Sequence, residues 1–272
     1  MRWTQFGAFS PLMRPHGKAP RDPWYFGEAA VANYQFWAWV RESLLDYIYH
    51  AAVVAHESGI PMIRSMPVAF PHEQPLADLR DQYMFGEDLL ITPVIDERGS
   101  RTIAFPSGQW TDLLNGKTFA GPANTEVNLP FDKIGVYLRP GAAVPVQLNL
   151  EFQFGKSMSK GCVNALVVTP PKGAETTQRR NAKGQTAEVS VRTDGNAFVW
   201  TIEDLLETDH LLVYGIIAPA AVLVDGKVVP TRTTSPVGSL TYWEDEPGGN
   251  RLIIHLPSRQ ARSNVVTVRI ET

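Results

Sequence analysis

The stretch that decides the fold spans residues 28–71 and reads EAAVANYQFWAWVRESLLDYIYHAAVVAHES, then GI, then PMIRSMPVAFP. Its first part, Glu28 to Ser58, contains no Gly or Pro, and its apolar residues recur every three or four positions, as one helix face requires. The residues of this face are Phe36, Val40, Leu44, Ile48, Ala52 and Ala55. Gly59 and Pro61 follow as a stop signal. The stretch therefore predicts one long helix.

The second part of the stretch, Pro61 to Pro71, is short, apolar and bounded by proline. Such a run suits a buried strand that follows the helix. A helix followed by a strand predicts an α/β architecture for the start of the chain.

From about Glu87 onward the pattern changes to short β-rich runs separated by Gly, Asn and Pro. Asn115-Gly116 and Asp225-Gly226 each predict a type I′ hairpin turn, because both central positions of that turn need a positive φ. The last run, residues 264–271, alternates apolar and polar residues from Val266, so one face of this strand is expected to be buried. The remainder of the chain is therefore predicted to be all-β and to close as β-sandwiches.

Two segments between these runs have little periodicity. Residues 149–160 and 170–185 are rich in Gly, Ser, Thr and basic residues, which predicts loop or linker. A domain boundary is expected near Gln147. No repeat with a period of about 20 to 50 residues is present, which argues against a solenoid or propeller.

Composition excludes several classes of function. The chain has 272 residues, 44% hydrophobic and 19% charged, which is enough for a substantial core. Its 25 Lys and Arg against 28 Asp and Glu give a formal net charge of -3, so nucleic acid and anionic membrane are not expected partners. No apolar run approaches the ~18 residues of a membrane span. Cys162 is the single cysteine and can form neither an internal disulfide nor a thiolate metal site.

The six histidines carry no metal-ligand spacing. His50 and His56 are six residues apart and lie on different faces of the expected helix, where we expect them at its surface. The sequence also contains no Gly-x-Ser-x-Gly elbow, Walker loop or dinucleotide fingerprint. We therefore expect no metal and no cofactor.

One segment combines aromatic, Arg and His residues: RWTQFGAFSPLMRPHG at 2–17, with Pro23-Trp24 shortly afterwards. Aromatic faces can pack on the apolar face of a pyranose while Arg and His donors reach its hydroxyls, which predicts a sugar site. The alternative is a buried aromatic loop with Arg14 in a structural ion pair, and composition alone favours that alternative.

This segment resembles the signature near the end of the catalytic barrel in glycoside hydrolase family 31, the α-glucosidases and α-xylosidases. The resemblance continues in family order through the long helix and then through GIPMIR (59–64), YMFGEDLLITPV (83–94), GQWTD (108–112) and VYLRPG (136–141). It covers about residues 1–148 and implies the last units of a (β/α)8 barrel followed by two β-sandwich domains. The implied division is 1–86 barrel remnant, 87–147 proximal sandwich and 148–272 distal sandwich-like domain.

The resemblance assigns His16 to hydrogen bonding of the sugar at the cleavage point and Arg14 to ordering that pocket, so both are expected to bind substrate. Neither is a nucleophile, and no residue is assigned a catalytic role. Trp110-Thr111-Asp112 resembles the family's Trp-x-Asp nucleophile motif, but it is expected in a β-hairpin and is rejected. Asp22, Glu28 and Asp88 are interpreted as solvated or capping carboxylates.

A retaining glycosidase needs two carboxylates about 5 to 5.5 Å apart, and the family places both earlier in its barrel than this sequence begins. About 86 residues precede the β-rich part, which is too few to close a barrel. We therefore expect the C-terminal part of a retaining α-glycosidase acting on an α-glucoside or α-xyloside, inactive alone, with Met1 an internal methionine used as a start.

The expected partners are an α-linked oligosaccharide or glycoside and a chain that carries the missing half of the barrel. The alternative function is a non-catalytic carbohydrate-binding or assembly module, in which the sandwiches bind glycan or a partner and the barrel remnant is only an interface.

Overall fold

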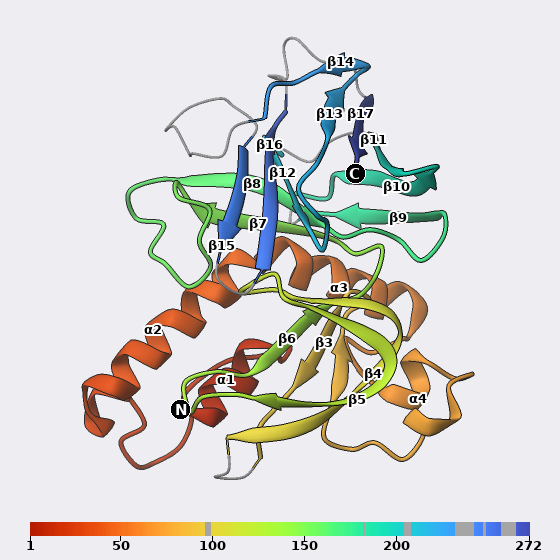
Figure 1. Ribbon diagram of the computed structural model, residues 1–272. Helices are drawn as coiled ribbons and strands as arrows, with labels where there is room; N and C mark the ends of the chain where they lie inside the picture. The colour runs from red at the N-terminus through yellow and green to blue at the C-terminus, as the bar shows by residue number, and fades with distance from the viewer. Residues whose placement is uncertain (96–98, 182, 204–207, 232–241, 247–248, 257–264) are drawn as a thin grey trace.

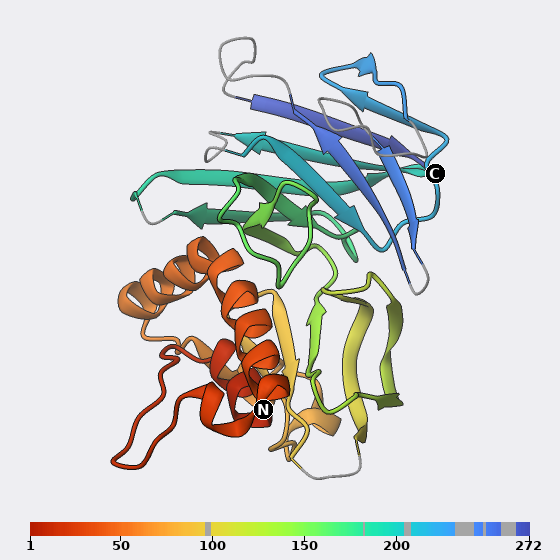
Figure 2. The ribbon, with the colours of Figure 1, turned by 90° about the vertical axis from the view of Figure 1, so that its left-hand side faces the viewer.

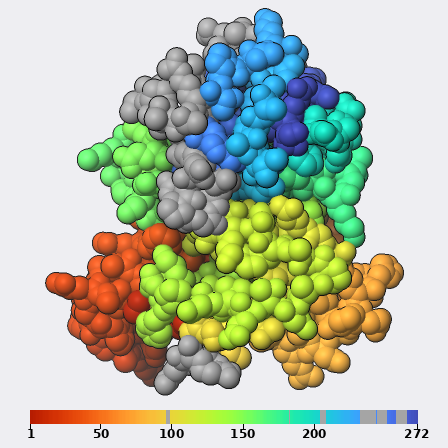
Figure 3. All heavy atoms as spheres, in the orientation of Figure 1, coloured from red at the N-terminus to blue at the C-terminus, as the bar shows by residue number. Residues whose placement is uncertain are grey.

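The computed structural model describes residues 1–95, 99–181, 183–203, 208–231, 242–246, 249–256 and 265–272. Helices and one sheet form one half of the molecule, and two stacked sheets form the other (Figure 1). Figure 3 shows the two halves in contact across the face turned to the viewer. The predicted fold class, an α/β start followed by β-sandwich domains, is confirmed.

The predicted long helix is two helices. The chain starts with α1 (Arg2–Ala8) and the 3-10 helix η1 (Pro23–Phe26), and α2 (Glu28–Ser43) and α3 (Leu45–Ser58) then meet at Leu44. The Ser43 hydroxyl donates to the Trp39 carbonyl at 2.9 Å, a back-bond that competes with the helix ladder and favours a bend. The end of α3 agrees with the sequence, since Gly59 caps it in the left-handed conformation with φ 76°.

The bend lets both helices cover one core. Leu44 at the bend is fully buried, as are Trp37 and Val40 on α2, while Tyr47 and Ile48 on α3 face the same cluster. A straight helix of this length would carry one end away from the core, so the bend increases the apolar area that the pair removes from water. Figure 2 shows the two helices at an angle beneath the sheets.

The buried strand predicted for Pro61 to Pro71 is wrong over most of its length. Only β1 (Ile63–Ser65) is a strand, and the chain then forms the short helix α4 (Met66–Ala69) and the 3-10 turn η2 (Gln74–Leu76). Pro67 lies in the first turn of α4, where its missing N–H costs no hydrogen bond. Met66 alone of this helix is buried.

The proximal sheet has the order β1-β2-β3-β6-β4-β5. Its further strands are β2 (Tyr83–Phe85), β3 (Leu89–Thr92), β4 (Ser100–Asp112), β5 (Thr118–Asn128) and β6 (Gly135–Leu138). Alternate side chains face opposite sides: Leu89 and Ile91 join the helices, whereas Leu90 packs with Phe105 and Trp110 of β4. The long β4–β5 hairpin thus folds over the outer face of its own sheet (Figure 2).

The other half is a sandwich of two sheets. The middle sheet has the order β15-β16-β12-β8-β7 and the distal sheet the order β14-β13-β17-β11-β10-β9. Their strands are β7 (Ala143–Asn149), β8 (Cys162–Val168), β9 (Glu175–Arg180), β10 (Thr186–Asp194), β11 (Ala197–Glu203), β12 (His210–Tyr214), β13 (Ala221–Val224), β14 (Lys227–Val228), β15 (Tyr242–Glu246), β16 (Gly249–His255) and β17 (Val265–Glu271).

The middle sheet is buried on both faces. Ala165 and Val167 of β8 face the core shared with the helices, whereas Leu166 and Val168 face the distal sheet. Because alternate side chains of β8 pack on opposite sides, this one strand contributes to the core beside the helices and to the core beneath the distal sheet.

Some of the turn and loop predictions are confirmed and others are wrong. Asp225-Gly226 is a type I′ turn, with φ 49° and 75°, but of Asn115-Gly116 only Gly116 has a positive φ, within a longer turn in which the Gly116 amide donates to the Asp112 carbonyl. The final strand alternates as predicted. The loop predicted for 170–185 is wrong in its middle, because β9 pairs there with β10 as the polar edge strand of the distal sheet.

The division of the chain at residues 86 and 147 stays a prediction. β7 runs through Gln147 and pairs along its whole length with β8. No helix in the described part of the chain is both long enough and apolar enough to cross a membrane.

Candidate functional site

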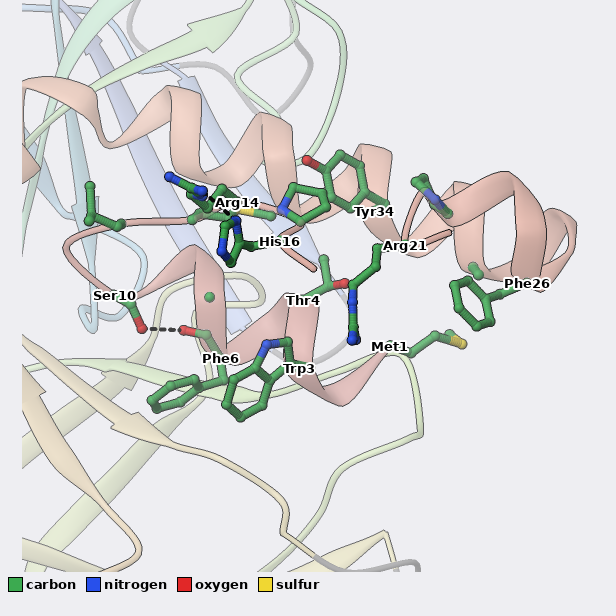
Figure 4. A pocket seen from close by; sticks show the side chains of 16 residues that line it. Met1, Trp3, Thr4, Phe6, Ser10, Arg14, His16, Arg21, Phe26 and Tyr34 are labelled. Atoms are coloured by element: carbon green, nitrogen blue, oxygen red, sulfur yellow. Dashed lines mark hydrogen bonds between the residues drawn. The ribbon is translucent and has the colours of Figure 1, made fainter. Parts of the chain in front are cut away.

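An open pocket of about 750 Å³ lies between α1, the loop that follows it and the start of α2. Its apolar wall includes Trp3 and Phe6 of α1, Phe26 of η1 and Tyr34 of α2. Figure 4 shows these rings around the space into which the loop side chains reach. The pocket therefore combines aromatic faces with a polar loop.

Both substrate-binding residues predicted from the sequence line this pocket. Arg14 and His16 extend from the loop after α1, and the Arg14 guanidinium contacts the Nδ1 atom of His16 (Figure 4). Arginine has donors only, so the guanidinium is the donor in this contact. Both side chains are exposed. The guanidinium N–H groups that do not contact His16 are therefore available to donate to a ligand oxygen, and Nε2 of His16 is open to a ligand.

The alternative of a buried aromatic loop with an Arg14 ion pair does not match the structure. Trp24, Tyr25 and Phe26 are 64%, 62% and 68% exposed. Within the described residues Arg14 pairs with no carboxylate and contacts His16 instead. The loop is thus open and rich in donors.

The pocket is also without acids. Among the described residues, no Asp or Glu lines it, while Arg14, Arg21 and His16 do. Aromatic faces with several N–H donors can bind and orient a polyhydroxylated ring. They cannot by themselves supply a carboxylate nucleophile or a carboxylic acid, which are the groups that cleave glycosidic bonds in most glycosidases.

The carboxylates considered from the sequence lie elsewhere. Glu28 is exposed in the first turn of α2, and Asp22 precedes η1 without a side-chain capping bond. Asp112 ends β4, and its carboxylate accepts the amides of Leu114 and Asn115 at 2.8 and 3.2 Å. Burial raises the pKa of Asp112 to about 6. The hairpin position predicted for Asp112 is confirmed.

Asp88 is neither solvated nor a cap, so that interpretation is wrong. It is fully buried at the contact between the proximal and distal sheets. Its Oδ1 accepts from Arg139 Nε at 2.9 Å, its Oδ2 pairs with Arg179, and Arg139 also pairs with Glu175 of β9. Two arginines therefore neutralise one buried carboxylate, as a charge removed from water requires.

His50 is likewise not a surface histidine. It is buried where α3 packs on β9, and its Nδ1 accepts the Arg180 backbone amide at 3.1 Å. Burial, with the neighbouring Arg179, lowers the pKa of His50 to about 4. His56, one and a half turns later on α3, is exposed as predicted.

One feature of the sequence indicates that Asp88 is buried. Glu87 and Asp88 stand directly before the fully buried strand β3, inside an otherwise apolar segment. A charged pair in that setting indicates a buried ion pair. Nothing in the sequence around Arg179 indicates its partner, because Asp88 lies 91 residues away in the chain.

Two domains of one protein family match consecutive parts of this chain. The family described as "Glycosyl hydrolases family 31 TIM-barrel domain" matches residues 1–51, and "Glycosyl hydrolase family 31 C-terminal domain" matches residues 59–144. The chain belongs to glycosyl hydrolase family 31. The pocket with Arg14 and His16 falls in the part that matches the family's barrel domain.

Relatives within family 31 are glycosidases and transferases. The isomaltosyltransferase of Sporosarcina globispora is 26% identical over 97% of this chain and 26% of its own length. The α-xylosidase XylQ of Lactiplantibacillus pentosus is 38% identical over 49% of this chain and 18% of its own. The chain thus spans about a quarter or less of the length of these curated relatives.

A solved structure shows the same fold. The cycloalternan-forming enzyme from Listeria monocytogenes, solved in complex with its pentasaccharide substrate, superposes with a TM-score of 0.85 at 23% identity. The match covers 99% of this chain and 27% of that enzyme. The fold of this chain, with its helices, proximal sheet and distal sandwich, is therefore the fold of part of that enzyme.

Proposed function

We propose that this chain is the C-terminal part of a retaining α-glycosidase that hydrolyses O-glycosyl bonds of α-glucosides or α-xylosides. The observation that carries the proposal is that Arg14 and His16 meet at one aromatic-walled pocket in the part of the chain that matches the family-31 barrel domain. Their role is to bind and orient the sugar at the cleaved bond, with hydrogen bonds that strengthen in the transition state.

The two catalytic carboxylates belong, in this proposal, to a barrel segment outside these 272 residues. The absence of any Asp or Glu from the described lining of the pocket supports this assignment. A retaining mechanism needs one carboxylate to attack the anomeric carbon and a second, about 5 to 5.5 Å away, to protonate the leaving oxygen. The chain on its own is then inactive.

The proposed partners are an α-linked oligosaccharide or glycoside and a barrel-forming segment, joined to this chain or supplied as a separate one. The apolar residues that the barrel-matching part exposes support the second partner. Trp3 is 81% exposed and Leu12 is 80% exposed, and both line one pocket with Phe26, which is 68% exposed. Large apolar side chains exposed together in this way are typical of an interface.

The test compares two samples on aryl α-glucosides and aryl α-xylosides. One is the purified chain, and the other is the chain fused to or mixed with the barrel segment of a family-31 relative. We expect turnover in the second sample only. Turnover of the chain alone that survives rigorous purification, and that is removed by substituting one of its own acidic residues, would refute the proposal.

A second candidate is a non-catalytic carbohydrate-binding or assembly module, which the acid-free pocket also favours. The two candidates differ in what the barrel segment adds. If the chain alone binds an α-linked oligosaccharide in a calorimetric titration and the barrel segment produces no turnover, the binding module is the better description.

A further inference from the structure

The side chain of Arg41 on α2 is spread over the backbone that leads into the pocket loop. Its Nη1 donates to the carbonyls of Gly7, Ala8 and Ser10 at 3.4, 3.0 and 2.6 Å, and its Nη2 donates to Pro11 at 2.8 Å. α1 ends at Ala8, so these oxygens belong to its last turn and to the start of the loop. The carbonyls of Gly7 and Ala8 are in the last turn, where a helix leaves its carbonyls without intrahelical partners, and the Gly7 carbonyl also accepts the Ser10 amide.

A positive charge suits this position for two reasons. The carboxyl end of a helix carries partial negative charge, so a cation there is stabilised. The planar guanidinium also offers five N–H donors in a fixed fork, which can serve several carbonyls at once, whereas a lysine ammonium is a compact point charge. Burial lowers the pKa of Arg41, but a guanidinium remains protonated throughout the physiological range.

The one carbonyl that Arg41 does not reach is held from the other side. Tyr83 of β2 donates its hydroxyl to the Phe9 carbonyl at 3.0 Å, and the Phe9 ring is fully buried edge-on against Trp37. Five successive carbonyls, residues 7–11, are therefore each hydrogen-bonded to a side chain of α2 or β2.

The anchored segment ends just before the two binding residues. Arg14 and His16 lie three and five residues beyond Pro11, and both are exposed and held by contact with each other. Their position over the aromatic wall is thus determined by the backbone from which the loop departs. A rigid support of this kind is what a binding group needs if it is to meet a transition state within a fraction of an ångström.

We propose that Arg41 is a positioning residue for the family-31 sugar subsite, acting through the loop that carries Arg14 and His16. The inference rests on the proposed function of that pocket. Arg41 touches no substrate in this arrangement, and its effect on catalysis passes through His16 and its neighbour.

The experiment is a double-mutant cycle on kcat/KM in the chain complemented with its barrel segment. The variants are Arg41→Ala, His16→Ala and the combination, with Arg41→Lys as a second variant if Arg41→Ala does not fold. We expect Arg41→Ala to lower kcat/KM by about 10- to 100-fold in the wild-type background and by less than about 3-fold when His16 is already absent. Arg41→Lys should fall between wild type and Arg41→Ala.

Arg2→Ala is the matched control, because Arg2, at the first position of α1, also donates to backbone carbonyls, but to those of Leu129 and Pro130 and at the opposite end of α1 from the Arg41 contacts. Its fold-change should be the same with and without His16. An Arg41 effect that is equal in both backgrounds, or absent, would overturn this inference alone. If His16→Ala leaves kcat/KM unchanged, the proposed function fails first, and this inference fails with it.

Discussion

Two arginine-centred regions of the molecule differ in almost every physical respect. At the pocket, Arg14 meets His16, and both are exposed. At the contact between the two halves, Arg179 is 1% exposed and pairs with Asp88, which is fully buried and shared with Arg139. The first region keeps unused donors in water, whereas the second has its charges paired and removed from water.

This difference separates binding from support. A donor that is already committed to a buried carboxylate cannot serve a ligand without breaking a costly pair. Exposed donors that contact each other lose little when a sugar hydroxyl takes the place of water. The open region, the pocket with Arg14 and His16, therefore has donors that a sugar could use. The closed region, the cluster of Asp88, Arg139 and Arg179, links the distal sandwich to the half of the molecule that contains the pocket.

The largest effect on the free energy of unfolding is expected from a substitution in the closed region. Asp88→Ala leaves Arg139 and Arg179 at the interface without their shared carboxylate, and should reduce the free energy of unfolding by about 3 to 5 kcal/mol. Denaturant unfolding of the chain measures this loss. The control is Asp194→Ala, which removes a surface ion pair with Arg269 and should change stability little. Equal losses in the two variants would show that the interface cluster is not special.

A smaller loss of stability is expected from His50 as the pH is lowered. The folded pKa of His50 is about 4, below its ordinary value of 6.5, so the folded state resists the proton that the unfolded chain accepts. His50 therefore contributes stability that is present above pH 6.5 and is lost as pH falls toward 4. Between pH 7 and pH 5, wild type should lose on the order of 1 kcal/mol more than His50→Asn, whose amide oxygen can still accept from Arg180.

The comparison with His50→Asn is needed because other groups also change protonation state between pH 7 and pH 4. The pKa of His210 is also lowered to about 4, and that of Asp112 is raised to about 6, which acts in the opposite direction. Both are common to the two proteins and cancel in the difference. Parallel pH profiles for wild type and His50→Asn would contradict the buried, neutral state of His50.

The smallest effect on folding, but a visible one on solubility, is expected at the open region. The chain alone should bind a hydrophobic dye and associate, because Trp24 and Phe26 are exposed. Trp24→Ser with Phe26→Ser should reduce both signals, whereas Val228→Ser on the distal hairpin, a side chain that is also 70% exposed but lies outside the barrel-matching part, should not. A monodisperse wild-type chain that unfolds cooperatively and binds no dye would count against the proposed barrel interface.

Sequence reasoning succeeded where a local pattern decides the structure. The period of two in β17, the Asp225-Gly226 turn and the Gly59 cap are each fixed by a few neighbouring residues. It failed where a distant partner decides. The bend at Leu44 follows from Ser43 and from packing both helices on one core, and β9 is a strand because β10 offers it an edge.

The same distinction applies to the candidate site. The sequence predicts that Arg14 and His16 share a pocket, and the structure contains that pocket. Their binding of a sugar stays a prediction. The burial of His50 and the hydrogen bonds of Arg41 to α1 depend on partners more than thirty residues away in sequence, so no local pattern indicates them. For Asp88 the local pattern indicates burial but not its partner Arg179, which lies 91 residues away.

If His16 lines the subsite for the cleaved sugar, as proposed, then His16→Ala must lower kcat/KM in the chain complemented with its barrel segment. His56→Ala is the control, since His56 is exposed on α3, whereas His50 is buried and its loss would damage the fold. We expect kcat/KM of His16→Ala to fall by tens to thousands of fold, or about 2 to 4 kcal/mol, with stability changed by less than ~0.5 kcal/mol, and kcat/KM of His56→Ala to stay unchanged. Wild-type kinetics in both variants would contradict the proposed role of His16.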